Sequence, residues 1–149
     1  MITVRVPLGE RSYDVLVGHG CRHELAGLLP GGVTRAAVVT QHGIPLDVDP
    51  GVPCEVFEIG HGESHKSLAT IEQLCRGFAR FGLTRNDVVI GVGGGMVTDV
   101  AGFAAASWHR GVPVVHVATT LLGMIDAAIG GKTGVNLPES GGIGGKNLI

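Results

Sequence analysis

The chain has 149 residues, 44% of them hydrophobic and only 4% aromatic, and its formal net charge is -2. This length suits one ordinary domain, which we expect to span residues 1–149. The charge gives no electrostatic reason to expect nucleic acid or an anionic membrane as a partner. The longest apolar runs fall far short of the roughly 20 residues of a membrane span, and the N-terminus lacks a signal layout. We therefore expect a soluble, cytoplasmic protein.

Glycine is the most informative residue type in the composition. The 26 glycines follow no regular period, which indicates tight turns and ligand-binding loops. A core of Val, Ile, Leu and Ala is typical of parallel strands covered by helices. The three cysteines, Cys21, Cys54 and Cys75, are widely spaced, which fits neither a disulfide framework nor a zinc ribbon, and we expect buried thiols.

The first third of the chain predicts a hairpin followed by alternating helix and strands. Polarity alternates in Thr3–Leu8 and Tyr13–Val17, on either side of a short turn. A short helix is expected around Arg22–Leu29. Two apolar runs, Ala36–Val39 and Cys54–Ile59, predict strands.

The most clearly patterned helix is expected over Ser64–Gly82. Its apolar residues recur at helical spacing, Ser64 is a possible N-terminal cap, and Gly82 is a common stop residue. The predicted helix ends shortly before a strongly apolar segment.

Strand, glycine loop and helix follow one another in the next segment. Asp87–Val92 predicts a buried strand, Gly93-Gly94-Gly95 a loop and Val97–Ser107 a helix. A further strand is expected at Val112–Ala118 and a second helical stretch at Leu121–Ile129. This alternation predicts an α/β fold with a Rossmann-like, open, mostly parallel sheet, preceded by the N-terminal β-hairpin.

The loop Gly91-Val92-Gly93-Gly94-Gly95 has the chemistry of a phosphate cradle. It ends a buried strand and opens a helix, so backbone N–H groups and the positive end of the helix dipole meet there without side-chain obstruction. The spacing is not the Rossmann G-x-G-x-x-G, because Met96 stands where the last glycine is required. Taken alone, three glycines also fit a simple tight turn.

Several charged residues have ordinary explanations when each is taken alone. Lys66 fits a solvated helix lysine, Asp99 a first-turn acid that complements the helix dipole, and Arg110 a surface charge. Lys132 differs, because the glycines around it leave its ammonium group accessible. Its surroundings do not form a P-loop, since Ile125 stands where the first glycine is required.

Two histidine pairs have the spacing of metal ligands on a helix. His19 and His23 are four residues apart, as are His61 and His65. Each pair has a glycine between its members and no evident third ligand, which favours solvated or capping histidines. We therefore predict no metal site in this chain.

An ordered set of motifs identifies a resemblance over most of the chain from about residue 60. The motifs are Gly62–Ser67, Gly93–Phe103, His109–Gly111, Thr119–Leu122, Asp126, Gly130–Asn136 and Gly145–Asn147. This set closely resembles the 3-dehydroquinate synthase family, a group of sugar-phosphate cyclases that use NAD.

The resemblance assigns roles to individual residues. It implies cofactor contacts from Gly62, Glu63, Lys66, Gly94, Gly95, Met96, Val97, Thr98, Asp99, Thr119, Thr120, Lys132 and Lys146. It implies catalytic or substrate contacts from Asp126, Lys132, Asn147 and Arg110. In the family, the residue that Arg110 resembles reaches the substrate phosphate of the neighbouring subunit, so this role requires a homodimer.

The implied activity is the conversion of 3-deoxy-arabino-heptulosonate 7-phosphate to 3-dehydroquinate and phosphate, a lyase step of aromatic amino acid biosynthesis. NAD is reduced and then regenerated within the cycle. The family's divalent metal, zinc or cobalt, is bound by an all-helical C-terminal half. The last residues, Lys146–Ile149, have no cap or turn, so we expect a truncated chain. Because the metal-binding half would then be missing, we expect this chain to be inactive by itself.

Alternatives remain open at this point. Other sugar-phosphate cyclases, of the 2-deoxy-scyllo-inosose or valiolone type, share the glycine loop, and a non-catalytic NAD-binding module is also compatible. Polyol and iron-dependent alcohol dehydrogenases fit less well, because Val100-Ala101-Gly102 replaces their usual Thr-Ala-Lys. Two features depart from the family: a long Leu137–Gly145 link, and Gln41 at a position where the family can offer an acid to the adenosine ribose.

Overall fold

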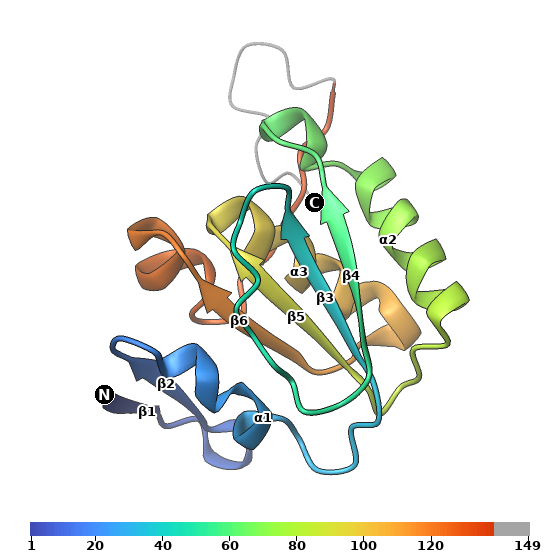
Figure 1. The fold of residues 1–149 in the computed structure, drawn as a ribbon. Helices are drawn as coiled ribbons and strands as arrows, with labels where there is room; N and C mark the ends of the chain where they lie inside the picture. The colour runs from blue at the N-terminus through green and yellow to red at the C-terminus, as the bar shows by residue number, and fades with distance from the viewer. Residues whose placement is uncertain (139–149) are drawn as a thin grey trace.

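A computed structural model describes residues 1–138 of the chain (Figure 1). Its centre is a four-stranded sheet, and a two-stranded hairpin lies apart from that sheet near the N-terminus. The elements in chain order are β1 (Ile2–Val6), η1 (Gly9–Arg11), β2 (Tyr13–Val17), η2 (Cys21–Glu24), α1 (Leu25–Leu28), β3 (Ala36–Gln41), β4 (Cys54–Ile59), η3 (Glu63–His65), α2 (Leu68–Phe81), β5 (Val88–Gly93), α3 (Gly95–Ser107), η4 (Trp108–Arg110), β6 (Val114–Ala118) and the π-helical turn η5 (Gly123–Ala127).

All strand pairs of the central sheet are parallel, in the order β4-β3-β5-β6. In the register, Val38 of β3 lies between Val56 of β4 and Ile90 of β5. The chain moves from β3 outward to β4 on one side, and from β5 outward to β6 on the other. The loops that leave β3 and β5 therefore diverge at the carboxyl edge. Such a switch point is where open α/β sheets bind ligands.

The two faces of the sheet have separate apolar cores. One core joins α2 and α3 to the sheet residues Ala37, Val39 and Val89. The other is built on Ala36, Val38, Val88, Ile90 and Val92, and is covered by Leu25 of α1 and by the connection between β3 and β4. Burial on both faces explains why β3 and β5 are continuous apolar runs. The prediction of an open parallel sheet with an N-terminal hairpin is confirmed.

The predicted start of α2 was wrong by one turn. Ser64 lies in η3, and the cap is Ser67, whose Oγ accepts a hydrogen bond from the Thr70 amide (3.3 Å). The helix is delayed because Lys66 has a non-helical backbone conformation, with φ -82° and ψ 70°. The predicted end at Gly82 is confirmed, since this glycine takes the left-handed conformation with φ 74°.

Other boundaries differ more modestly from the predictions. Helix α3 begins at Gly95 and not at Val97, because Gly94 is its N-cap and Gly95 its first residue. Helix α1 has only one turn, preceded by η2. Cys54 is exposed on the outer strand β4, so the expectation that all three thiols are buried was wrong. No helix within residues 1–138 has both the length and the apolar character of a membrane span.

Asp87 fastens the start of β5 to the start of β3. Its carboxylate is fully buried and accepts hydrogen bonds from the amides of Thr34 (3.0 Å), Arg35 (2.9 Å) and Thr84 (2.7 Å). The hydroxyls of Thr34 and Thr84 donate as well. Burial raises the pKa of this carboxyl, but the hydrogen bonds from Thr84 and Thr34 outweigh burial and lower its pKa to about 2.

We predict that Asp87 makes the fold sensitive to acid. Its folded pKa lies below the ordinary value of 3.8, so its stabilisation is complete above that value and is lost as pH falls toward about 2. Over this window the unaltered chain should lose about 2 kcal/mol more unfolding free energy than Asp87→Asn does. Urea unfolding between pH 5 and pH 2 measures this difference. The control is Asp49→Asn, at an exposed turn; an equal acid response of the two variants contradicts the role of Asp87.

Candidate functional site

The glycine loop lies at the carboxyl end of β5, beside the switch point. A Cβ on Gly93 would lie 2.6 Å from Cγ2 of Val97, and one on Gly94 would lie 3.1 Å from Cγ2 of Thr120. The close packing therefore requires glycine at position 93 and strongly favours it at 94. Unlike α2, which Ser67 caps, α3 has no side-chain cap at its N-terminus. Its first-turn amides are thus available to an anion from outside the chain.

Neighbouring strand ends border this loop on both sides. From β6, the Thr119 amide donates to the Gly93 carbonyl (2.9 Å), and the Thr120 hydroxyl accepts from the Gly123 amide (3.2 Å). From β3, the Gln41 side-chain amide donates to the Gly60 carbonyl (3.0 Å) and reaches Sδ of Met96 at 3.6 Å. The ends of β3, β5 and β6 thus form one continuous border.

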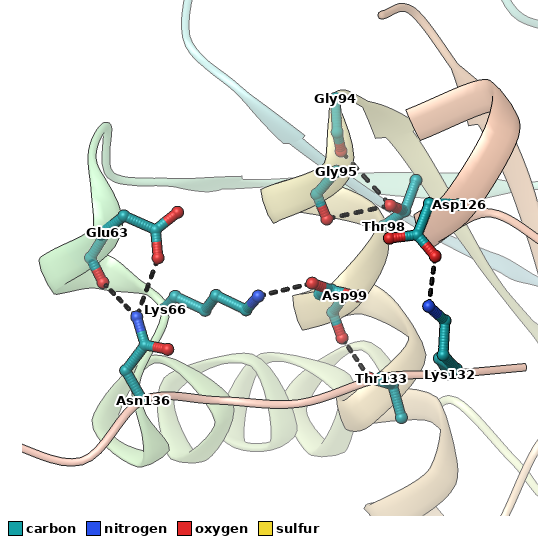
Figure 2. Close-up of polar contacts among 10 residues, drawn as sticks. All are labelled: Glu63, Lys66, Gly94, Gly95, Thr98, Asp99, Asp126, Lys132, Thr133 and Asn136. Atoms are coloured by element: carbon teal, nitrogen blue, oxygen red, sulfur yellow. Dashed lines mark hydrogen bonds and ion pairs between the residues drawn. The ribbon is translucent and has the colours of Figure 1, made fainter. Parts of the chain in front are cut away.

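A buried ion pair joins the start of α2 to the first turns of α3. Nζ of Lys66 lies 2.5 Å from Oδ2 of Asp99, and the two side chains are only 6% and 16% exposed. The Thr133 hydroxyl donates to the backbone carbonyl of Asp99 (Figure 2). Three segments that are far apart in the sequence therefore meet at Asp99.

Asn136 connects the third of these segments to the first. Its side-chain amide donates to Oε2 of Glu63 (2.9 Å) and to the Glu63 carbonyl (3.2 Å), and its backbone amide donates to the Lys66 carbonyl (2.8 Å). Figure 2 shows Glu63, Lys66 and Asn136 on one side of the group and Asp99 with Thr133 on the other. The segment 133–136 thus lies across the helix starts that carry the predicted cofactor contacts.

Asp126 and Lys132 form a second ion pair, but an exposed one. Asp126 lies in the π-helical turn η5, and the side chains of Asp126 and Lys132 are 53% and 68% exposed. The hydrogen bond and the negative charge of Asp126 raise the pKa of Lys132. The accessible ammonium group agrees with the sequence interpretation of Lys132. The turn that carries Asp126 packs on the start of α3, since a Cβ on Gly95 would lie 3.5 Å from Cβ of Ala127.

His116 occupies a space that two glycines leave open. A Cβ on Gly91 would lie 3.0 Å from its Nδ1, and one on Gly102 would lie 3.7 Å from its Nε2. Nδ1 is buried and has no hydrogen-bond partner within residues 1–138. Burial lowers the pKa of His116, and the Asp99 carboxylate opposes this shift. The imidazole therefore adds no positive charge near the pair of Lys66 and Asp99 at neutral pH.

The predicted site residues do not all meet at one place. Gly62, Glu63, Lys66, Gly94, Gly95, Met96, Asp99, Thr119 and Thr120 border the glycine loop or the adjoining ion pair. The side chains of Val97 and Thr98 are fully buried, and Thr98 donates its hydroxyl to the carbonyls of Gly94 and Gly95. Arg110 lies at the opposite, amino edge of the sheet, before β6. Lys146 and Asn147 lie outside the described residues.

Sequence reasoning did not single out several residues that organise this site. Thr133 and Asn136 belong to a recognised motif, but their contacts with Asp99 and Glu63 span 34 and 73 residues. Ser67 lies three residues after the predicted cap Ser64, and its spacing to Thr70 was a usable signal. The contact between Gln41 and Met96 spans 55 residues and has no signature in the sequence.

Comparison with known families gives this arrangement a context. A family profile described as "3-dehydroquinate synthase N-terminal" matches residues 56–149. The chain belongs to the 3-dehydroquinate synthase family. The matched region begins within β4 and includes the glycine loop and every ion pair described above.

Individual relatives agree with the family assignment. A protein of Amycolatopsis mediterranei described as an aminodehydroquinate synthase is 52% identical over 99% of this chain and 41% of its own length. A 3-dehydroquinate synthase of Cutibacterium acnes is 46% identical over 93% of this chain and 37% of its own length. The chain thus spans about two-fifths of the length of these relatives.

Solved structures of related cyclases share the fold. A 2-deoxy-scyllo-inosose synthase complexed with carbaglucose-6-phosphate, NAD+ and Co2+ has a TM-score of 0.86 and 25% identity, over 99% of this chain and 41% of its own. A 2-epi-5-epi-valiolone synthase of Streptomyces hygroscopicus subsp. jinggangensis, with NAD+ and Zn2+ bound, has a TM-score of 0.73 and 32% identity, over 97% of this chain and 41% of its own. In residues 1–138 of this chain, no three His, Cys, Asp or Glu side chains group as metal ligands.

We predict that removing one partner of the Lys66–Asp99 pair costs far more stability than removing one partner of a surface pair. Lys66→Met leaves the nearly buried Asp99 carboxylate uncompensated, which should cost about 3 kcal/mol of unfolding free energy. The matched control is Arg76→Met, which breaks an exposed pair with Glu72 (70% and 64% exposed) and should cost less than about 0.5 kcal/mol. Chemical unfolding measures both values. Similar losses in the two variants contradict the prediction.

Proposed function

We propose that this chain binds NAD at the switch point and serves the conversion of 3-deoxy-arabino-heptulosonate 7-phosphate to 3-dehydroquinate and phosphate. The observation that carries the proposal is the uncapped N-terminus of α3, directly after the glycines that end β5. Family membership and the NAD+ named in two structural neighbours support it.

The residues around the loop suit a dinucleotide. The amides of Gly95 and Met96 and the dipole of α3 attract a diphosphate, and Gly94 allows it to approach without a side chain between. Glu63, Lys66, Asp99, Thr119 and Thr120 supply acceptors and donors for ribose or nicotinamide groups. Gly62, Val97 and Thr98 contribute through backbone geometry. Bound NAD supplies reversible hydride transfer, which none of the chain's side chains can provide.

The substrate side of the proposal concerns Asp126, Lys132 and Arg110. The Lys132 ammonium group is exposed and has three donors, so it can bind an anionic substrate group while it keeps its hydrogen bond to Asp126. Asp126 then orients the ammonium group by its hydrogen bond. Arg110 serves a second copy of the chain, in a homodimer. The proposed cofactor contacts also include Lys132 and Lys146. The proposed substrate contacts also include Asn147.

The remaining expectations concern a longer protein. Co2+ and Zn2+ are named in the two structural neighbours, and we propose a divalent metal for the enzyme of full length. The proposed lyase activity and aromatic amino acid pathway follow from the 3-dehydroquinate synthases among the relatives. The name of the Amycolatopsis relative, an aminodehydroquinate synthase, favours an aminated analogue of the same substrate as a second candidate. We also propose a cytoplasmic location for the enzyme.

An introduced helix cap tests the cofactor site. Gly94→Asp places a carboxylate on the α3 amides, where it competes with a diphosphate and repels it. We expect a melting temperature at or above that of Gly94→Ala, which carries the same Cβ, and an NAD affinity weakened at least about 30-fold, measured by calorimetric titration. The control Gly94→Ala adds only the Cβ near Thr120 and should weaken NAD binding by less than about threefold. Equal weakening by both substitutions, or no NAD binding by the unaltered chain, contradicts the proposal.

A chimera tests the substrate. The chain is joined to the C-terminal portion of the Cutibacterium acnes relative, and phosphate release is followed with heptulosonate, glucose and sedoheptulose phosphates. We expect preference for the heptulosonate phosphate and a kcat/KM at least about 100-fold lower in Lys132→Met, because the anion loses its ammonium partner. Arg11→Met, on the hairpin turn, is the control and should retain activity. Preference for either other sugar phosphate contradicts the proposed substrate.

A further inference from the structure

Two arginines and a histidine line one hollow at the amino edge of the sheet. The hollow has a volume of about 290 Å³ and is lined by Arg85, His109 and Arg110. All three residues are exposed, and within residues 1–138 none of their side chains belongs to an ion pair. Two guanidinium groups that share a hollow without a carboxylate repel each other, and a bound anion would reverse that repulsion.

The backbone that carries two of these residues is strained. His109 and Arg110 have φ values of 49° and 67°, and in residues 1–138 no other non-glycine residue has a positive φ. Such conformations cost free energy for residues with a Cβ and persist only where the surroundings enforce them. They are concentrated at binding and catalytic sites.

Trp108 enforces this turn from one side. Its indole Nε1–H donates to the Leu83 carbonyl (3.2 Å), and its ring packs edge-on against Phe78, with centroids 5.9 Å apart. The His109 ring contacts the same indole, with centroids 4.8 Å apart. The amide of Gly111 closes the turn by donating to the Trp108 carbonyl (2.8 Å).

The loop of Arg85 is fixed from the other side of the hollow. Its neighbour Thr84 donates its amide and hydroxyl to the buried Asp87 carboxylate, each at 2.7 Å, and the Asp87 amide donates back to the Thr84 carbonyl (3.2 Å). Leu83 precedes this turn and accepts the bond from Trp108. The two loops are therefore tied directly to each other, which fixes the backbones that carry the two guanidinium groups.

The hollow lies at the end of the strands opposite the glycine loop. Arg85 precedes β5 and Arg110 precedes β6, whereas the glycine loop follows β5 (Figure 1). Five residue steps along β5 separate the two edges by about 17 Å. A phosphate on a substrate at this chain's own glycine loop therefore cannot occupy the hollow.

We propose that Arg85, His109 and Arg110 together form a binding site for a phosphate monoester, with Arg85 as a second guanidinium beside Arg110. The inference deepens the proposed function and rests on it only for the role of Arg110 toward a second copy. The phosphate is either free in solution or part of a sugar phosphate held by that second copy. Both sources share the same dianionic group, which suits two guanidinium groups with an imidazole beside them.

Titration with inorganic phosphate tests the site. Amide chemical shifts of residues 84–86 and 109–111 are followed in the isotope-labelled chain at constant ionic strength. We expect saturable shifts and an affinity at least about tenfold weaker in Arg85→Gln, because one charge-assisted contact is lost. Arg11→Gln, which removes the same charge from the hairpin turn, should change the affinity less than about twofold. Equal effects of the two substitutions, or shifts that do not saturate, overturn the inference.

The two sources of the phosphate are distinguished by how the dissociation constant for phosphate depends on protein concentration. A dissociation constant that stays the same in dilute and concentrated samples supports binding of free phosphate. Binding that strengthens with the dimer fraction, measured by light scattering, supports a site completed by a second copy. NAD is titrated into the same unaltered samples. Phosphate binding without NAD binding contradicts only the proposed function, and NAD binding without phosphate binding contradicts only this inference.

Discussion

The burial of Lys66 against Asp99 constrains the arrangement of the whole candidate site. A lysine ammonium group that is removed from water needs its carboxylate partner in place, because either charge left alone is costly. Helix α3 must therefore start within reach of the segment that precedes α2. The third segment is fixed to the same point, since Thr133 donates to the Asp99 carbonyl and Asn136 to Glu63. One electrostatic requirement thus sets the positions of three distant parts of the chain.

Local groups, and not the overall charge, create the regions of positive potential in this protein. The net charge is -2, yet the uncapped start of α3 and the exposed Lys132 both present positive potential at the carboxyl edge of the sheet. The unpaired cations at the amino edge form a separate region of the same sign. The fold therefore separates two regions of positive potential by the length of a strand.

The sequence predicted the fold and the nature of the site better than its details. Continuous apolar runs predicted β3 and β5 because both faces of these strands are buried. The glycines after β5 predicted the turn from β5 into α3 because their reason is local. Ser64 was a wrong cap because the non-helical Lys66, held in a tertiary ion pair, overrides local helix signals. Three of the five hydrogen bonds that Asp87 accepts come from residues 52 or 53 positions away. The left-handed turn at His109 follows Trp108, whose bond to Leu83 spans 25 residues, and spacing alone does not encode such contacts.

The strand order has a consequence for synthesis on the ribosome. Strand β5 lies between β3 and β6 in space but follows β4 in the chain, so a nascent polypeptide displays one side of β3 with no neighbour until residue 93 has emerged. During that interval the apolar Ala36–Val39 run is an open edge of the kind that recruits foreign strands. Chaperone occupancy should accordingly peak on nascent chains that end between the completion of β4 and the exit of β5.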